Sequence, residues 1–184
     1  MFKHEKADKL LAPERQKKIP IDKVLTLLAL DEDDVVADLG CGNGYATLPI
    51  AKKVKTNVKA VDIQPEMLAL LKERATAATI NNIDYIESPL DDLHLEEKSL
   101  DKVIIAFVLH EVPNIVKVFD DLQSILKEDG KLLILEWEAV ASEEGPPLHH
   151  RLPSNQLATQ LEKHGFQTEL GHFNDDVYYI VAKK

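Results

Sequence analysis

Three alternate glycines form the pattern in this sequence with the clearest chemical meaning. They are Gly40, Gly42 and Gly44, and they follow a short apolar run that ends in Asp38-Leu39. Glycine accepts positive φ angles and leaves room for a ligand against the backbone, so a loop of this kind between a strand and a helix is a candidate cofactor cradle. The alternative is a tight strand-to-helix turn that binds nothing.

Two classes of adenosine cofactor use such a loop. A dinucleotide loop has the spacing G-x-G-x-x-G and places a pyrophosphate at the helix N-terminus. Here Tyr45 stands where the third glycine belongs, and Asp38 lies two residues before the first one. A carboxylate at that point repels a pyrophosphate and attracts a cation, such as the ammonium group of an amino acid. The loop therefore favours S-adenosylmethionine (SAM) over NAD.

A second carboxylate ends the next apolar run. Asp62 follows Val58–Val61, and at the tip of a strand its side chain can accept hydrogen bonds from both ribose hydroxyls. The alternative is a cap for the helix that Pro65 begins, but Asp62 lies early for a cap. Because NAD enzymes use the same acid, Asp62 predicts an adenosine ligand without choosing between the two cofactors.

Candidate catalytic groups follow two later apolar runs. His110 could act as a base because its unperturbed pKa lies near neutrality, and Glu136 could orient an amine or a hydroxyl. A packing histidine and a solvated carboxylate are the alternatives. Trp137 is predicted either to wall a substrate pocket or to pack in the core. The adjacent pair His149-His150 is not expected to hold a metal, because neighbouring residues seldom ligate one ion together.

The elements that must position these residues alternate in type. Short β-branched runs alternate with segments of helical spacing, which predicts a doubly wound α/β fold with a largely parallel sheet and helices on both faces. The segment 141–153 holds one glycine and three prolines and is predicted to be a long loop, a feature that is often functional. The strands are expected at Val35–Leu39, Val58–Val61, Asp84–Glu87, Val103–Phe107 and Leu132–Leu135.

Turn and cap signals divide the second half of the chain. An apolar helical stripe from Ile115 to Leu126 is followed by Asp129-Gly130, which predicts a turn, and Ser154 is expected to cap the last helix. The final two runs, Phe166–Phe173 and Val177–Ala182, have only three residues between them. So short a connection allows only an antiparallel hairpin.

Composition limits the classes of partner. The chain has 184 residues, which suits a single domain, and its net charge of −10 works against nonspecific binding to a phosphate backbone. No apolar run is long enough to cross a bilayer, and Met1 to Ile19 does not resemble a signal peptide. The single cysteine, Cys41, excludes an internal disulfide, so a cytoplasmic location is the default expectation.

Taken together, these residues resemble the class I SAM-dependent methyltransferases, in particular the small UbiE-like branch. The segment from Val35 to Ala51 resembles the first motif of that family, and Val58 to Leu68 resembles its second. The similarity covers nearly the whole chain. It implies one Rossmann-like domain over residues 1–184 with a seven-stranded sheet, mostly parallel, and an antiparallel C-terminal hairpin strand. Residues 1–20 would form an N-terminal helix or lid segment.

The resemblance also implies roles for particular residues. Asp38 and the loop Gly40-Cys41-Gly42-x-Gly44 would hold the methionine part of SAM, and Asp62 would hold the ribose. Ile63 would pack against adenine, and the backbone N–H of Leu90 would face the same ring. Ala106 and Phe107 would lie beneath the cofactor near the sulfonium. Pro89 stands where the family has an acid that contacts the adenine amino group, and Asp91 is the residue that could replace that acid.

The acceptor of the methyl group is not encoded in any motif. Methyl transfer from a sulfonium is an in-line displacement in which the cofactor supplies the reactive group, so the protein needs no catalytic signature. The acidic composition favours a small-molecule acceptor and disfavours nucleic acid. Methylation of a protein or RNA through a partner, and a SAM-binding module without catalysis, are the alternatives. The product from SAM would be S-adenosylhomocysteine.

Overall fold

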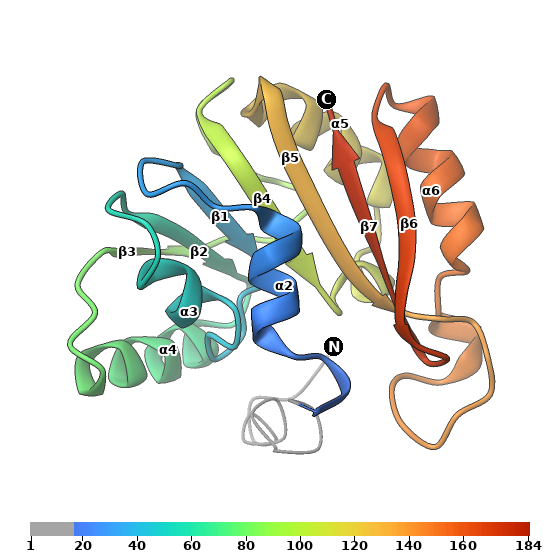
Figure 1. The fold of residues 1–184 in the computed structure, drawn as a ribbon, viewed down its shortest axis with the longest axis horizontal. Coiled ribbons are helices and arrows are strands. Elements are labelled where there is room, and N and C mark those ends of the chain that lie inside the picture. Colours follow the sequence, from blue (N-terminus) through green and yellow to red (C-terminus); the bar gives the residue numbers. More distant parts are fainter. Residues whose placement is uncertain (1–16) are drawn as a thin grey trace.

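The computed structural model describes residues 17–184, and within them seven strands form one sheet in the order β3-β2-β1-β4-β5-β7-β6 (Figure 1). β1 pairs in parallel with both β2 and β4, β2 with β3, and β4 with β5. β7 is antiparallel to both of its neighbours, β5 and β6. The predicted doubly wound fold with an antiparallel C-terminal hairpin strand is confirmed. The strands are β1 (Val36–Leu39), β2 (Val58–Asp62), β3 (Ile83–Glu87), β4 (Leu100–Ala106), β5 (Leu126–Trp137), β6 (Gln167–Asn174) and β7 (Val177–Lys183).

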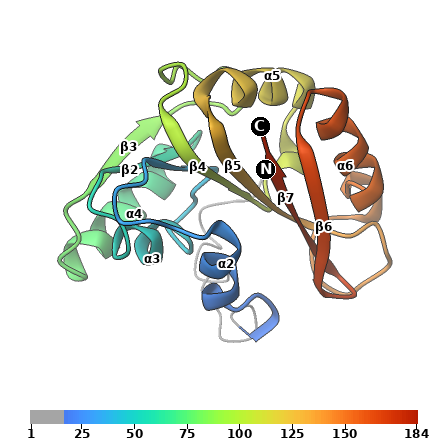
Figure 2. The ribbon, with the colours of Figure 1, turned by 45° about the horizontal axis from the view of Figure 1, so that its top comes forward.

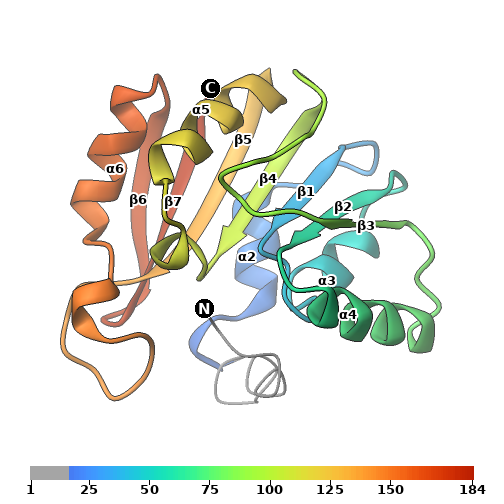
Figure 3. The same ribbon diagram turned by 180° about the vertical axis from the view of Figure 1, so that it is seen from behind.

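Helices cover both faces of the sheet, and each face has its own core (Figures 2 and 3). Apolar side chains of α2, α3 and α4 pack on one face with Val36, Val58 and Ile104 of the strands. Side chains of α5 and α6 pack on the other face, around Phe119 and Leu161. The helices are α2 (Ile21–Leu28), α3 (Thr47–Ala51), α4 (Pro65–Ala77), α5 (Ile115–Ile125) and α6 (Ser154–Lys163), with short 3-10 turns η2 (Leu109–Glu111) and η3 (Leu148–His150). No described helix is long and apolar enough to span a membrane.

Two local predictions need correction. The turn at Asp129-Gly130 lies inside β5, whose register against β4 shifts between the pairs Leu100–Leu126 and Lys102–Lys131, so the extra residues form an irregularity in the strand. Ser154 is the first residue of α6, and the N-cap position belongs to Pro153, which has no side-chain hydrogen bond to offer. The N–H of Ser154 is instead satisfied by the carboxylate of Glu138, 3.2 Å away. A long-range partner has replaced the expected local cap.

The topology places the glycine loop at a point where the chain reverses direction across the sheet. From β1, the chain runs outward to β2 and β3 and then returns to β4 on the other side of β1. In open α/β sheets, ligands bind outside the carboxyl ends of the strands at such a switch point. The loops after β1, β2, β4 and β5 therefore converge on one edge, and they carry most of the predicted site residues.

Candidate functional site

A small cavity lies in the glycine loop at this edge. Its volume is about 50 Å³, and Asp38 and Ala106 line it from the ends of β1 and β4. The remaining lining residues come from the loop itself: Gly40, Cys41, Gly42, Asn43, Tyr45 and Ala46. Five of the residues predicted to bind the cofactor, Asp38, Gly40, Cys41, Gly42 and Ala106, are thus brought together.

The three glycines have positive φ angles, of 76°, 51° and 88° in chain order. At Gly40 an added Cβ would lie 2.7 Å from a methyl carbon of Val108, and at Gly44 it would collide with Leu71. The left-handed backbone and the close neighbours both require glycine. Glycine is thus required at Gly40 and Gly44 because the side chains of Val108 and Leu71 lie against the loop backbone. From the sequence, the glycines were expected to leave room for a ligand.

Asp38 is the one acid among the described residues that line the cavity, and it is 2% exposed. Its carboxylate accepts a hydrogen bond from the hydroxyl of Thr47, 2.6 Å away. Burial raises the pKa of Asp38 to about 7. The hydrogen bond from Thr47 lowers this pKa, and the negative charge of Asp62 raises it. Thr47, on the first turn of α3, has no exposed surface, and no role was predicted for it from the sequence. Its position three residues after Gly44 was the available signal.

Asp62 connects the second strand to the glycine loop. One carboxylate oxygen accepts from the N–H of Gly42 at 2.8 Å, and the other accepts from the N–H of Gln64 at 2.9 Å. Gln64 is itself the N-cap residue of α4, so Asp62 is not the cap of that helix. Burial is the largest cause of the raised pKa of Asp62, and the charge of Glu111 adds to it.

The predicted adenine contacts lie on different surfaces. Ile63 is 51% exposed, which leaves a free apolar face beside Asp62. The side chain of Leu90 is buried in the core on the α5 face, so only its backbone can meet a ligand.

Phe107 follows β4 with a positive φ of 60°, an unusual conformation for an aromatic residue. Its ring packs against that of Trp137, with the centroids 5.5 Å apart.

The two catalytic candidates form a buried pair. The Nδ1 atom of His110 lies 2.9 and 2.8 Å from the two carboxylate oxygens of Glu136, and the backbone N–H of His110 donates to the same group at 3.3 Å. The Glu136 carboxylate also accepts from the N–H of Trp137 at 2.9 Å. The side chains of His110 and Glu136 are only 8% and 1% exposed. The solvated carboxylate considered for Glu136 is therefore wrong, because this group is enclosed by donors.

The pairing fixes the orientation of the imidazole. In the tautomer that donates from Nδ1 to Glu136, the other ring nitrogen, Nε2, carries a lone pair. A carboxylate oxygen of Glu111 lies 4.0 Å from Nε2, beyond hydrogen-bond distance. The base predicted from a single histidine is thus an oriented pair of His110 and Glu136, with Glu111 as a second acid beside it.

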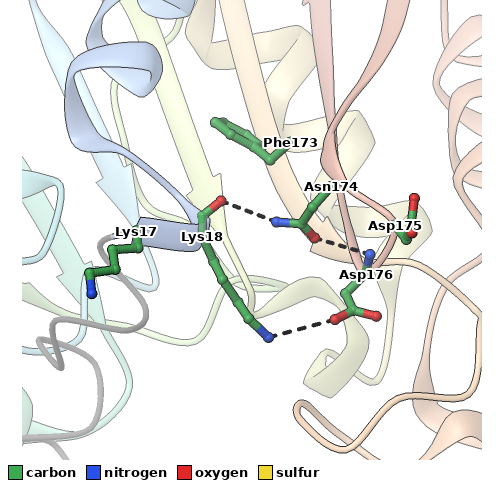
Figure 4. Close-up of a pocket in the computed structure, with 6 residues that line it drawn as sticks. All are labelled: Lys17, Lys18, Phe173, Asn174, Asp175 and Asp176. Carbon is green, nitrogen blue, oxygen red and sulfur yellow. Dashed lines mark hydrogen bonds and ion pairs between the residues drawn. The ribbon is translucent and has the colours of Figure 1, made fainter.

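The chain just before α2 crosses near the glycine loop. The hydroxyl of Tyr45 donates to the backbone carbonyl of Ile19, which is buried. On the other side, Asn174 donates to the carbonyl of Lys18 at 3.1 Å, and the Lys18 ammonium pairs with Asp176 at 3.7 Å (Figure 4). The same ammonium pairs with Glu144 at 3.1 Å. Of the N-terminal segment predicted over 1–20, residues 1–16 lie outside the described residues.

A second hollow, of about 440 Å³, opens beside this crossing. Lys17, Lys18 and four residues around the β6–β7 turn line it, from Phe173 to Asp176 (Figure 4). It holds none of the residues predicted for the cofactor or for catalysis. The buried acid Asp38 and the glycine loop meet instead at the smaller cavity.

Comparison with known proteins decides the family. The family model described as a methyltransferase domain matches residues 36–130, just over half of the chain, from β1 to the start of β5. The chain belongs to this methyltransferase domain family. SAM is the cofactor that the family and the fold imply.

Individual relatives of the methyltransferase domain agree with this assignment. A ubiquinone/menaquinone biosynthesis C-methyltransferase of Rhizobium meliloti is 33% identical over 112 residues, 59% of this chain and 43% of that protein. A malonyl-[acyl-carrier protein] O-methyltransferase of Marinomonas sp. is 29% identical over 115 residues, 61% of this chain and 42% of that protein. The chain spans about half the length of the curated relatives it matches. The crystal structure of a SAM-dependent methyltransferase from Aquifex aeolicus superposes with a TM-score of 0.91 at 25% identity, and the match covers 100% of this chain and 99% of that one.

The charges around the cavity suit SAM. A buried carboxylate with a raised pKa gains from a cationic ligand, and SAM carries an ammonium group and a sulfonium. Asp38, Asp62 and Glu111 together make the surroundings of the loop acidic, which is unfavourable for a pyrophosphate. The preference for SAM over NAD that the spacing suggested thus has an electrostatic basis in the folded chain.

Proposed function

We propose that this methyltransferase domain transfers the methyl group of SAM to a small molecule, and that His110, oriented by Glu136, is the general base. The observation that carries the proposal is the buried His110–Glu136 pair at the carboxyl ends of β4 and β5. Ala106, the last residue of β4, lines the cavity together with Asp38, and His110 follows it four residues later in the chain. A buried imidazole and carboxylate of this kind cost free energy in a fold, so a functional role is the natural reason for them.

Each residue that was predicted to bind the cofactor has a part in holding SAM. Asp38 binds the ammonium group of the methionine part, and backbone groups of the loop from Gly40 to Gly44, with Cys41 between them, surround its carboxylate end. Asp62 accepts from the ribose hydroxyls, for which its bond from Gly42 must be shared or released. Ile63 offers its exposed face to adenine and Leu90 its backbone N–H, while Ala106 and Phe107 form the floor. When bound, SAM supplies an electrophilic methyl carbon.

The protein's own part in the transfer is orientation and proton removal. Nε2 of His110 takes the proton from the acceptor's O–H, N–H or activated C–H as that atom attacks the methyl carbon, and Glu136 stabilises the imidazolium that forms. An acceptor that loses a proton on methylation is therefore expected. The acidic surroundings favour an uncharged or cationic acceptor over an anion. We also propose a single domain, acting in the cytoplasm; its single cysteine supports that location.

Calorimetry with SAM, S-adenosylhomocysteine and NAD in parallel tests the first half of the proposal. Binding of the two adenosyl ligands without NAD is expected, and binding of NAD alone would overturn the assignment of SAM as the cofactor.

A screen for methyl transfer from labelled SAM to small phenols, amines and enols tests the second half of the proposal, with His110→Ala as the comparison. SAM binding without transfer to any small molecule would favour a binding module or an acceptor presented by a protein or RNA partner.

A further inference from the structure

The loop between β5 and α6 is built around one arginine. Arg151 is only 7% exposed, and its guanidinium reaches five acceptors within residues 138–146. Charge-assisted bonds of this number can offset the entropy cost of ordering a segment without regular structure. The acceptors are the carbonyls of Glu138, Val140, Glu144 and Pro146 and the hydroxyl of Ser142; the distances to Val140, Ser142 and Pro146 are 2.8, 2.8 and 2.9 Å.

The same arginine presses the loop onto Trp137. The guanidinium carbon of Arg151 lies 5.6 Å from the centre of the indole ring, at cation–π distance. Gly145 approaches the ring so closely that an added Cβ would lie 2.7 Å from an indole carbon. Gly145 also has a φ of +89°, a conformation that suits glycine. Trp137 is consequently 7% exposed and packs with the core, so it does not wall an open pocket.

Trp137 in turn supports the floor of the cofactor cavity. Its ring contacts that of Phe107 at 5.5 Å and a tilt of 55°. Phe107 has the left-handed φ of 60°, and a residue other than glycine keeps such a conformation only when its surroundings impose it. Ala106, next to it in the chain, lines the cavity with Asp38. A continuous set of contacts thus runs from Arg151 through Trp137 and Phe107 to the cavity.

We propose that Arg151 is a positioning residue of this methyltransferase domain: by clamping the loop onto Trp137, it holds Phe107 in place at the floor of the SAM cavity. The last step rests on the proposed function, because it assigns Phe107 to the cofactor. The planar fork of arginine can serve acceptors on several sides at once, whereas a lysine has three donors at one point. Lysine is therefore expected to fail as a replacement although it keeps the charge.

The test compares Arg151→Gln and Arg151→Lys with a control in the same loop, His149→Ala, which removes an exposed side chain. Trp137 is the only tryptophan of the chain, so its fluorescence reports on the clamp directly. We expect a red-shifted emission in both arginine variants and a dissociation constant for SAM raised by about threefold or more, with neither change in the control. Gly145→Ala, which displaces the loop without altering a charge, is the second variant if Arg151→Gln does not fold.

Each result has a definite meaning. Unchanged emission in the Arg151 variants would overturn the clamp. A red shift with unchanged SAM affinity would show that the clamp holds the loop alone and would overturn the positioning role. If Arg151→Lys had the emission and the SAM affinity of the wild type, the positive charge at position 151 would be sufficient, and the claim that the planar fork is required would be wrong. Failure of the wild-type chain to bind SAM would be seen before any variant is compared, and it would reject the proposed function separately.

Discussion

Protonation of Asp38 is expected to control the affinity for SAM between pH 6 and 7. Burial raises the pKa of this carboxyl to about 7, so about half of the unliganded protein carries it in the protonated form at neutral pH. The SAM ammonium favours the ionised form, so binding must release the proton. The dissociation constant should rise about fivefold between pH 7 and pH 6, and about 0.9 proton should be released per SAM at pH 6.

The same burial has a consequence for stability, with a defined sign. The folded-state pKa of Asp38 lies above its unfolded value of 3.8, so its contribution to stability is greatest below pH 4 and is lost as pH rises through about 7. The shift corresponds to about 4 kcal/mol of unfolding free energy for the unliganded protein. Asp38→Asn keeps an acceptor for Thr47 and removes the charge. It should therefore raise the melting temperature of the unliganded protein at pH 8 while weakening SAM binding.

The predicted dependence of SAM binding on pH can be tested by calorimetry. Titrations in two buffers of different ionisation enthalpy measure both the affinity for SAM and the number of protons released when SAM binds. Work at or below pH 7 keeps the SAM ammonium protonated, because α-amino groups titrate near pH 8. Asp38→Asn should lose the pH dependence, and His110→Ala should keep it. A dissociation constant that is equal at pH 6 and pH 7, with no proton release, would refute the assignment of Asp38 to the ammonium group.

Three further outcomes follow from single substitutions. Asp62→Ala should weaken SAM binding by about 1–3 kcal/mol, because it removes a charged acceptor for the ribose; unchanged affinity in calorimetry would reject that role. His110→Ala should leave SAM affinity nearly intact and slow methyl transfer by about 10²–10⁴-fold, measured with labelled SAM once an acceptor is found; a large loss of affinity would place His110 in the cofactor site instead. Gly44→Ala should lower the free energy of unfolding by about 1–3 kcal/mol, measured by denaturant titration, because its Cβ meets the buried Leu71 at a φ of +88°; an unaltered midpoint would show that the loop adapts freely.

Local patterns in the sequence predicted the α/β class and the C-terminal hairpin, and the resemblance to a known family added the seven-stranded sheet. The alternation of β-branched runs with helical spacing predicted the strand and helix order, and the three-residue gap before Val177 predicted the hairpin. Two boundaries were misplaced for a physical reason. Ser154 was expected to cap α6, but the carboxylate of Glu138, sixteen residues away, satisfies its N–H. The Asp129-Gly130 signal predicted a turn after a helix, whereas β5 already begins at Leu126 and these residues form an irregularity within it, between the pairs that Leu126 and Lys131 make with β4.

The sequence by itself determined which chemical groups are available and on which strand ends they stand, because backbone conformation depends on near neighbours in the chain. It placed Asp38, Gly40 to Gly44, Asp62, His110 and Glu136 at the edge where ligands bind. Only the tertiary structure decided their partners. The pairing of His110 with Glu136 depends on strand register and loop packing, which join residues far apart in sequence. The same is true of the contacts that Arg151 and Phe107 make with the Trp137 ring. Burial then changed the chemistry of these groups, since the raised pKa of Asp38 arises from desolvation that no local pattern records.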